Sequence, residues 1–128
     1  MTDIILRSQE YAQRAYNCVK QVKSESKDKY LTFAKRFPTL IHTCGLSQAV
    51  AFAASKDEYI HNLEDLGKVL GGEFNKLKYI EFSSIEFSSK VNEFHLGEYI
   101  RVSREALLAA GWLKLYAEGL LDKQGQEI

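Results

Sequence analysis

The sequence predicts an all-α protein, a compact single-domain bundle of about five to six helices with a long C-terminal helix. The main observation is the stretch 96–121, where apolar or small residues recur at alternating three- and four-residue intervals. A similar amphipathic pattern covers residues 3–23. We therefore expect one helical domain over residues 1–121, followed by a polar tail at 122–128.

The long helix over 96–121 would have two different faces. At 1.5 Å per residue it would be about 39 Å long, enough to serve as the spine of a small bundle. The face expected to turn inward carries Leu96, Tyr99/Ile100, Ser103, Ala106/Leu107, Ala110, Leu113, Ala117 and Leu120/Leu121. The opposite strip carries Glu98, Arg101, Arg104, Glu105, Lys114 and Glu118. This strip is expected to meet water or a partner.

The composition is that of an ordinary globular domain. Hydrophobic residues make up 45% and charged residues 27% of the 128 residues, which favours a sizeable core over disorder. No apolar run approaches the roughly 18 residues of a membrane span, and the first residues do not resemble a signal peptide. Cys18 and Cys44 are expected to be free thiols in a reducing cytoplasm, with a disulfide between them as the alternative.

The first half of the chain predicts three helices. The first covers residues 3–23, and its heptad rhythm is typical of packing in a bundle. The seam residues are Ile5, Ser8, Ala12, Ala15, Val19 and Val22. A second helix is expected over about 26–37 and a third over about 38–55. Between them we expect a break or sharp bend at Phe37–Pro38, because proline suits the first turn of a helix and disrupts its interior.

Small side chains make up the centre of the expected third helix, around Gly45. Glycine lowers helix propensity by roughly 1 kcal/mol relative to alanine, but small residues let a second helix approach closely. We expect Trp112, the only tryptophan, to fill the space beside Gly45. The alternative interpretation is that Gly45 ends one short helix and Ser47 caps the next.

The segment between these helices and the long last one is less regular. Ser55 and Glu58 form the pattern of a capping box, which marks a helix start, and the two glycines at 71–72 end this helix. Residues 73–82 fit a short helix. The serines that follow, between 83 and 89, indicate a loop or one short turn.

The sequence contains no catalytic signature, because it lacks a nucleophile elbow, a Walker loop, a dinucleotide-binding glycine pattern and an H-E-x-x-H motif. Among its three well-separated histidines, only His42 has a soft ligand nearby, Cys44. Residues at i and i+2 cannot face one metal from a regular helix. We therefore expect no catalytic residue, no metal site and no cofactor; a small helical enzyme would need an activity that depends on His42 or Cys44.

The net charge of zero conceals an uneven distribution. Residues 1–56 hold nine basic and four acidic residues, whereas residues 57–98 hold four and nine. This division would let copies attract one another or let one face bind an anion. A basic run between residues 20 and 36 is also interleaved with aromatic residues, and phosphate binding requires such cations. For both features, a solvated surface without a partner is the alternative.

Two segments together resemble a known family. One is KRFPTLIHTCGLSQAVAF, residues 35–52, and the other is YIRVSREAL, residues 99–107, followed by WLK at 112–114. They are similar to the two signature blocks of the small subunit of the type III-B CRISPR RNA-guided effector complex, member five of the Cmr family. The signature residues that carry the resemblance include Pro38, Gly45, Gln48 and Trp112, and we assign Gly45 and Trp112 to the core. That family often has Lys-Arg after its tryptophan block, where this chain has Leu115 and Tyr116.

The resemblance implies an all-α, cytoplasmic protein without catalytic activity of its own. Its copies would stack along an RNA-guided ribonucleoprotein of antiviral defence, beside the backbone subunits that hold the guide RNA and with a large subunit in the same complex. The subunit would support the filament and help to hold the target RNA against the guide RNA. No membrane partner is implied.

Six residues are our candidates for contact with RNA phosphates, which would position a strand without reading its sequence. They are Lys35, Arg36, His42, Arg101, Arg104 and Lys114. The first three bracket the expected bend at Pro38, and the last three lie along the polar strip of the long helix. The alternative is a purely protein-binding scaffold subunit without direct RNA contact, in which these cations pair with acidic faces of neighbouring subunits.

Overall fold

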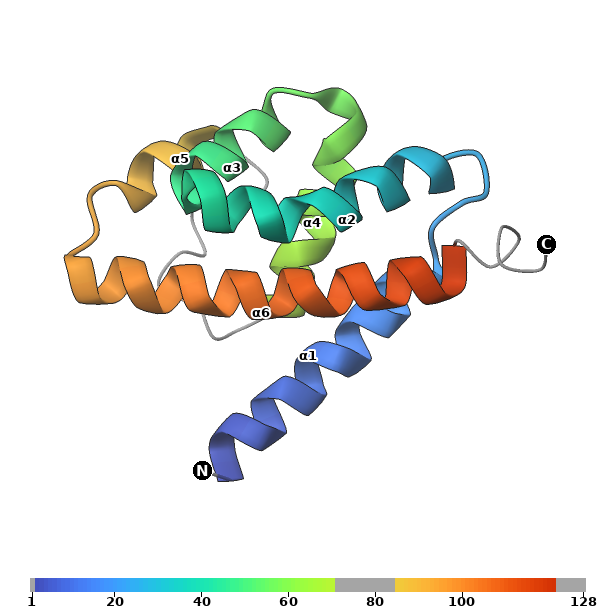
Figure 1. Ribbon diagram of the computed structural model, residues 1–128, viewed down its shortest axis with the longest axis horizontal. Helices are drawn as coiled ribbons and strands as arrows, with labels where there is room; N and C mark the ends of the chain where they lie inside the picture. Colours follow the sequence, from blue (N-terminus) through green and yellow to red (C-terminus); the bar gives the residue numbers. More distant parts are fainter. Residues whose placement is uncertain (1, 71–84, 122–128) are drawn as a thin grey trace.

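The computed structural model describes the backbone of residues 2–70 and 85–121 and the side chains of residues 9–70 and 88–121. Within these ranges the chain forms six α-helices and no strand, which confirms the predicted all-α fold (Figure 1). The helices are α1 (Thr2–Lys20), α2 (Lys27–Cys44), α3 (Leu46–Ala54), α4 (Asp57–Leu70), α5 (Ile85–Val91) and α6 (Leu96–Leu121).

Some features of the sequence interpretation lie outside the described residues. These are the side chains of Ile5 and Ser8, the glycines at 71–72, the expected helix at 73–82 and the tail at 122–128. The rest of the heptad seam in α1 is described, and the buried positions of this helix are Tyr11, Ala15 and Val19. Tyr11 therefore belongs to the core, although it is not one of the predicted seam residues.

The spine of the bundle is α6, which begins and ends where the sequence predicted. Figure 1 shows α2 running alongside α6 while α1 crosses it, and both helices pack against α6. The buried residues of α6 are Val102, Ala106, Ala109, Ala110, Leu113 and Ala117. Most of them are alanines, whose small side chains let the backbones of α1 and α2 approach closely.

The predicted inner face of α6 is correct at its centre and wrong at its N-terminal end. Ala106, Ala110 and Leu113 are buried as expected, whereas the side chain of Leu96 is 74% exposed. Ile100 is also exposed, because Val102 is buried and residues two apart point to nearly opposite sides of a helix.

The predicted break at Phe37–Pro38 is wrong, because α2 continues through Pro38 to Cys44. Proline removes the hydrogen bond to the carbonyl of Ala34. The buried stripe of α2 continues on both sides of the proline, however, through Phe33, Phe37 and Ile41. Burial of such side chains contributes roughly 1.5–3 kcal/mol each, which offsets the loss of one hydrogen bond.

The chain instead turns at Gly45, which ends α2 and precedes α3 with φ 90° and ψ 157°. This left-handed backbone favours glycine, so the alternative interpretation that Gly45 ends a helix is confirmed. Ser47 does not cap α3, since Gly45 occupies the N-cap position. The Ser47 hydroxyl instead donates a hydrogen bond to the carbonyl of Ser88, at 2.8 Å.

Trp112 does not fill the space beside Gly45, as we had expected. A Cβ atom added to Gly45 would lie 3.2 Å from the hydroxyl of Tyr99. Trp112 is half-buried against the core and stacks on Tyr116. Of the other signature residues, Pro38 is half-buried and Gln48 is exposed, so Gln48 is not a core residue.

The expected capping box at Ser55 is also absent. The Ser55 hydroxyl donates to the carbonyl of Phe52 at 2.7 Å, because Ser55 closes the end of α3. The fourth helix still begins close to the predicted position, at Asp57. The serine-rich segment that predicted a loop or a short turn contains α5, a helix of seven residues.

A buried polar cluster joins α2 to α4. The Tyr30 hydroxyl donates to a carboxylate oxygen of Asp65 at 2.6 Å, and the Asn62 amide donates to the carbonyl of Tyr30 at 3.1 Å. Asp65 is only 2% exposed. A buried carboxylate is costly unless hydrogen bonds and charges compensate it, and the imidazole of His61 lies 3.3 Å from the same carboxylate.

We expect Tyr30→Phe to lower the free energy of unfolding by about 1.5–3 kcal/mol, because it removes a hydrogen bond to a buried carboxylate. Urea unfolding followed by circular dichroism measures this effect. The matched control is Tyr59→Phe, which keeps the ring that stacks on Phe33 and should change stability by less than about 0.5 kcal/mol. Equal stability of the two variants would show that the cluster does not hold α2 against α4.

We expect Gly45→Ala to lower the free energy of unfolding by about 1–3 kcal/mol, because it forces an L-residue into a left-handed conformation. Gly111→Ala is the control, since nothing lies within 4 Å of the added Cβ atom. Because Gly111 lies in the middle of a helix, Gly111→Ala should raise the free energy of unfolding by about 0.5–1 kcal/mol. A Gly45→Ala variant as stable as the parent would contradict the observed turn.

Candidate nucleic-acid interface

An open groove with a mainly apolar floor lies between α2 and α6, and we call it the α2–α6 groove. Its lining residues are Pro38, Leu107, Leu108, Gly111, Trp112, Lys114, Leu115 and Glu118. The side chains of Leu108 and Leu115 are 40% and 58% exposed. Within the described residues, no helix covers this side of α6 as α1 and α2 cover its alanine face.

Two of the predicted RNA-contacting residues lie on the α2 side of the groove. Lys35, Pro38 and His42 are spaced at i, i+3 and i+7, so they follow one line along α2. Pro38 lines the groove, and Lys35 and His42 are exposed on either side of it along that line. The break or sharp bend expected at Pro38 is absent, but Lys35 and His42 still share one flank because the helix is continuous.

The α6 side of the groove also carries cations. Arg104 precedes Leu108, Gly111 and Leu115 at intervals of four, seven and eleven residues, which places it on the same line of the helix. Lys114 is half-buried and lines the groove directly. Arg101 lies seven residues before Leu108 and is exposed on this side of α6.

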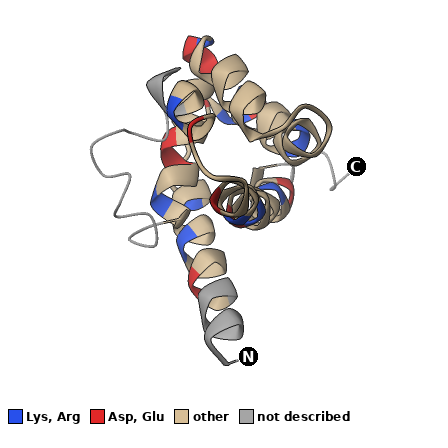
Figure 2. Ribbon diagram, turned by 90° about the vertical axis from the view of Figure 1, so that its left-hand side faces the viewer, with Lys and Arg blue, Asp and Glu red and all other residues tan. Residues whose placement is uncertain are grey.

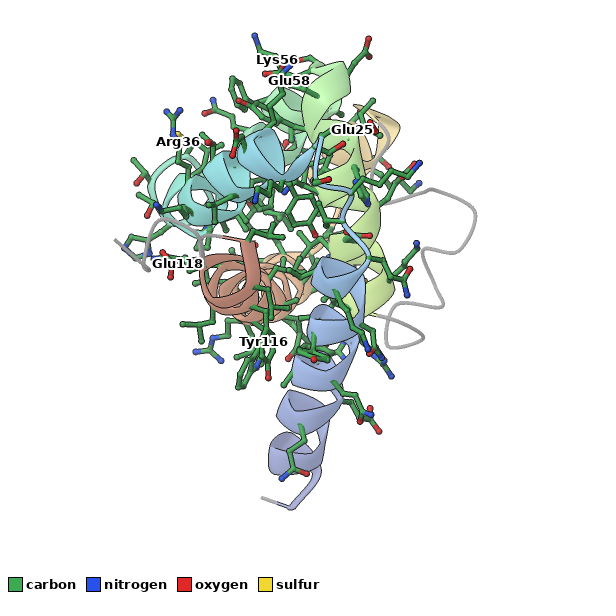
Figure 3. All side chains as sticks on the ribbon, turned by 90° about the vertical axis from the view of Figure 1, so that its right-hand side faces the viewer. Glu25, Arg36, Lys56, Glu58, Tyr116 and Glu118 are labelled. Carbon is green, nitrogen blue, oxygen red and sulfur yellow. The ribbon has the colours of Figure 1, made fainter. Side chains whose placement is uncertain are left out.

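Arg36 is the predicted residue that does not belong with the others. It is two residues from Pro38, which places it about 200° around α2 from the groove. Figure 3 shows Arg36 at the edge of α2 farther from α6, while Glu118 projects from α6 itself. The helix geometry therefore groups the other five, Lys35, His42, Arg101, Arg104 and Lys114, around the groove.

Sequence reasoning missed the apolar floor of the groove. The polar strip of α6 was expected to meet water or a partner, because only its charged residues were considered. Leu108 and Leu115, spaced at i and i+7, lie on the same side as Arg104. This leucine pair was the available signal that the strip is amphipathic.

The charge division along the sequence does not produce one basic and one acidic face. Figure 2 shows blue and red segments interspersed on several helices. Part of the charge difference between the first part and the middle of the sequence is also neutralised within the chain. The ammonium of Lys29, in the basic run, lies 3.7 Å from a carboxylate oxygen of Glu58 at the start of α4. These observations favour a mixed, solvated surface outside the groove.

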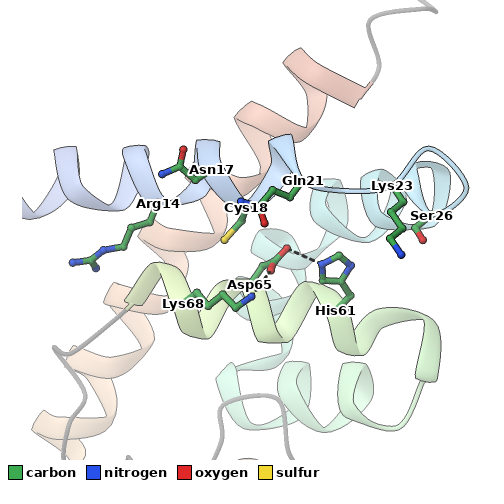
Figure 4. Close-up of a pocket in the computed structure, with 9 residues that line it drawn as sticks. All are labelled: Arg14, Asn17, Cys18, Gln21, Lys23, Ser26, His61, Asp65 and Lys68. Carbon is green, nitrogen blue, oxygen red and sulfur yellow. Dashed lines mark ion pairs between the residues drawn. The ribbon is translucent and has the colours of Figure 1, made fainter.

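A second hollow lies between α1 and α4 (Figure 4). Its lining residues are Arg14, Asn17, Cys18, Gln21, Lys23, Ser26, His61, Asp65 and Lys68. Asp65 already accepts the Tyr30 hydroxyl, and Arg14 donates to the carbonyl of Val69 at 2.8 Å. We therefore assign this hollow to the polar cluster that supports the fold.

The hollow between α1 and α4 contains no activated nucleophile among its described residues. Burial, with the nearby charge of Asp65, raises the pKa of the Cys18 thiol to about 11, so it stays protonated at neutral pH. Burial and Asp65 also raise the pKa of Tyr30. Both cysteines are free, as expected, and Cys44 is exposed at the end of α2. In the described part of the chain, no three His, Cys, Asp or Glu side chains are placed to hold a metal ion.

The described helices also include none that is both long and apolar enough to cross a bilayer. The fold and the groove thus define an all-α bundle whose basic, partly apolar face is suited to a polyanion or a protein. Comparison with known proteins identifies the family. A sequence model described as CRISPR-associated protein (Cas_Cmr5) matches residues 7–120.

The match extends to a relative and to a solved structure. The chain is 36% identical over 120 residues to the CRISPR system Cmr subunit Cmr5 of Thermus thermophilus, covering 91% of this chain and 97% of the relative. The crystal structure of a CRISPR-associated Cmr5 family protein from the same organism superposes with a TM-score of 0.76 at 37% identity, covering 90% of this chain and 97% of that one. The chain belongs to the Cmr5 family, which confirms the resemblance.

Proposed function

We propose that this chain is a non-catalytic small subunit of a type III-B CRISPR ribonucleoprotein, the Cmr complex, in the cytoplasm. Its copies stack along the complex, next to the backbone and large subunits, and help to hold target RNA against the guide RNA in antiviral defence. Family membership and the relative described as a Cmr subunit support the placement in this complex. The α2–α6 groove, with cations on both sides, is the observation that supports the RNA contact.

The groove suits phosphate contact for an electrostatic reason. Lys35 stands on α2, on the same flank as the imidazole of His42, and Arg104 and Lys114 stand on α6, so cations border a strand that follows the groove on both sides. Contacts of this kind position a strand and carry no sequence information. This is the behaviour required of a subunit in a complex whose target is chosen by base pairing with a guide.

The chemistry of the described residues supports a non-catalytic role. His42 lies exposed beside the groove, and Cys44 is exposed at the end of the same helix. The other thiol, Cys18, is held protonated by its buried surroundings. An activated nucleophile needs an adjacent base within hydrogen-bond reach, and the positions of His42 and Cys44, two residues apart on one helix, point their side chains in different directions.

A purely protein-binding scaffold is the second candidate, and the exposed leucines of the groove favour it. Leu108 and Leu115 would be buried by an apolar segment of a neighbouring subunit, with Lys35 and Arg104 pairing to acidic residues at its edge. Such a subunit would bind no RNA in isolation.

Binding of single-stranded RNA to the isolated protein separates these two functions. We expect a fluorescein-labelled oligo(U) of about 30 nucleotides to bind at low salt, with affinity that falls steeply as salt increases. Because each phosphate contact contributes about 0.7 to the salt slope on a single strand, the triple variant Lys35→Ala/Arg104→Ala/Lys114→Ala should lower that slope by about 2. Fluorescence anisotropy over a salt series provides the measurement.

The control variant is Lys29→Ala/Lys68→Ala/Lys90→Ala, which removes the same number of charges from exposed side chains away from the groove. Its salt slope should change by much less than that of the groove variant. Equal losses in the two variants would exclude the groove as the contact site. No binding by the parent protein at low salt would support the scaffold function.

A further inference from the structure

The proline inside α2 leaves a buried carbonyl in need of a hydrogen-bond donor. This carbonyl belongs to Ala34, and its usual donor in a helix would be the N–H of residue 38, which Pro38 lacks. Ala34 is only 5% exposed, so bulk water has little access to it. Buried carbonyls are nearly always paired in folded proteins. The donor for Ala34 must therefore come from outside the helical hydrogen-bond pattern of α2.

A second buried acceptor lies on α4, in the side chain of Asn62. This residue is 6% exposed, and no group among the described residues donates a hydrogen bond to its Oδ1 atom. The opposite orientation of the amide is excluded, because Nδ2 donates to the carbonyl of Tyr30 at 3.1 Å and an oxygen in its place could not donate. The Asn62 amide is thus fixed against α2 with its oxygen still to be paired.

The hydrogen bond from Asn62 to Tyr30 brings these two acceptors into one region. Tyr30 and Ala34 are four residues apart on α2, so their carbonyls follow one line of the helix about one 5.4 Å turn apart. The Asn62 amide, which contacts the Tyr30 carbonyl, is therefore held about one turn from the Ala34 carbonyl. Two acceptors cannot bond to each other, so pairing both requires a molecule with two donors.

A small internal cavity lies beside both acceptors, between α2, α4 and α6. Ala34 and Asn62 line it together with apolar side chains that include Phe37, Leu66 and Leu113. Every lining residue is at most 6% exposed, and Asn62 contributes the only polar side chain. The volume of the cavity is about 10 Å³, which is on the order of the space that one water molecule needs. A larger ligand is excluded by this size.

We propose that one ordered water molecule occupies this cavity and donates one hydrogen bond to the Ala34 carbonyl and the other to Oδ1 of Asn62. Water has the two donors that the acceptors require and the size that the cavity allows. It takes the place of the N–H that Pro38 lacks, and inserted water is a known way to complete an interrupted helical hydrogen-bond pattern.

This water site goes beyond the proposed function and does not depend on RNA contact. It adds a second reason why α2 continues through Pro38, besides the burial of the apolar stripe on both sides of the proline. The continuity of α2 is what places Lys35 and His42 on one flank of the α2–α6 groove. The water is therefore a positioning element for that flank.

High-resolution crystal structures of the parent protein and of Pro38→Ala test the site directly. In the parent we expect density for a water about 2.5–3.0 Å from both the Ala34 carbonyl oxygen and Oδ1 of Asn62. In Pro38→Ala the restored N–H of residue 38 bonds to the Ala34 carbonyl. The water should then lose its contact with Ala34.

Nuclear magnetic resonance tests the same site in solution and needs only the parent protein. A long-lived buried water should give a nuclear Overhauser effect to the side-chain amide protons of Asn62. A rotating-frame experiment separates this effect from proton exchange by its opposite sign. The internal control is the side-chain amide of Asn17, which is exposed and should show no contact with a long-lived water.

The outcomes decide the proposal without reference to RNA binding. A dry cavity in a parent crystal structure that shows other buried waters would overturn it, as would the absence of the Overhauser effect at Asn62. A water that keeps the same position and contacts in Pro38→Ala would also contradict the bridge to Ala34. Each of these results would leave the proposed RNA contact standing, because that contact is tested by RNA binding and not by the water.

Discussion

The close packing of α6 through its alanine face is the constraint on which the rest of the structure depends. Ala106, Ala109, Ala110 and Ala117 are buried, so α1 and α2 lie close to the backbone of α6. Larger residues here would push these helices away from α6 and lengthen the hydrogen bonds between them. One such bond joins α1 to α6, where the Tyr11 hydroxyl donates to the Glu105 carboxylate at 2.7 Å. Because α6 is held by this one face, its opposite side remains available along the groove.

The same constraint explains why the groove has both apolar and basic residues. A helix of 26 residues needs only one stripe of apolar residues to join the core. Leu108 and Leu115 are additional to that stripe, and they lie on the same line as Arg104. Their exposure is informative because large apolar residues that gather on one face of a protein mark interaction surfaces. The continuous α2 adds Lys35 and His42 on the other side.

Sequence periodicity predicted the fold class and the bounds of α6, because a long amphipathic pattern reports directly on one buried face. It misplaced the turn in the first half, since Pro38 was weighed as a local signal. Burial of Phe33, Phe37 and Ile41 on one continuous stripe outweighs one lost hydrogen bond, and that tertiary contribution is invisible in a local motif. The role of Gly45 was open in the sequence for a similar reason, because only the structure shows the left-handed backbone at that position.

The candidate site was less predictable than the fold. Of the six candidates, the helices place Lys35, His42, Arg101, Arg104 and Lys114 around one groove, whereas Arg36 lies on another side of α2. Trp112 was assigned to the core as a bulky signature residue that would fill the space beside Gly45. Its stacking on Tyr116 depends on α1 as well, through Tyr16, and such an arrangement between helices cannot be read from one segment.

The central claim is that the α2–α6 groove touches RNA in the assembled complex, and crosslinking tests it most directly. The tagged chain is isolated from its own cells with its bound partners, irradiated with ultraviolet light and digested, and its RNA-linked peptides are mapped by mass spectrometry. We predict that crosslinks fall within residues 35–42 and 104–115. Recovery of both segments without RNA, while neighbouring subunits in the same preparation carry crosslinks, would contradict the claim.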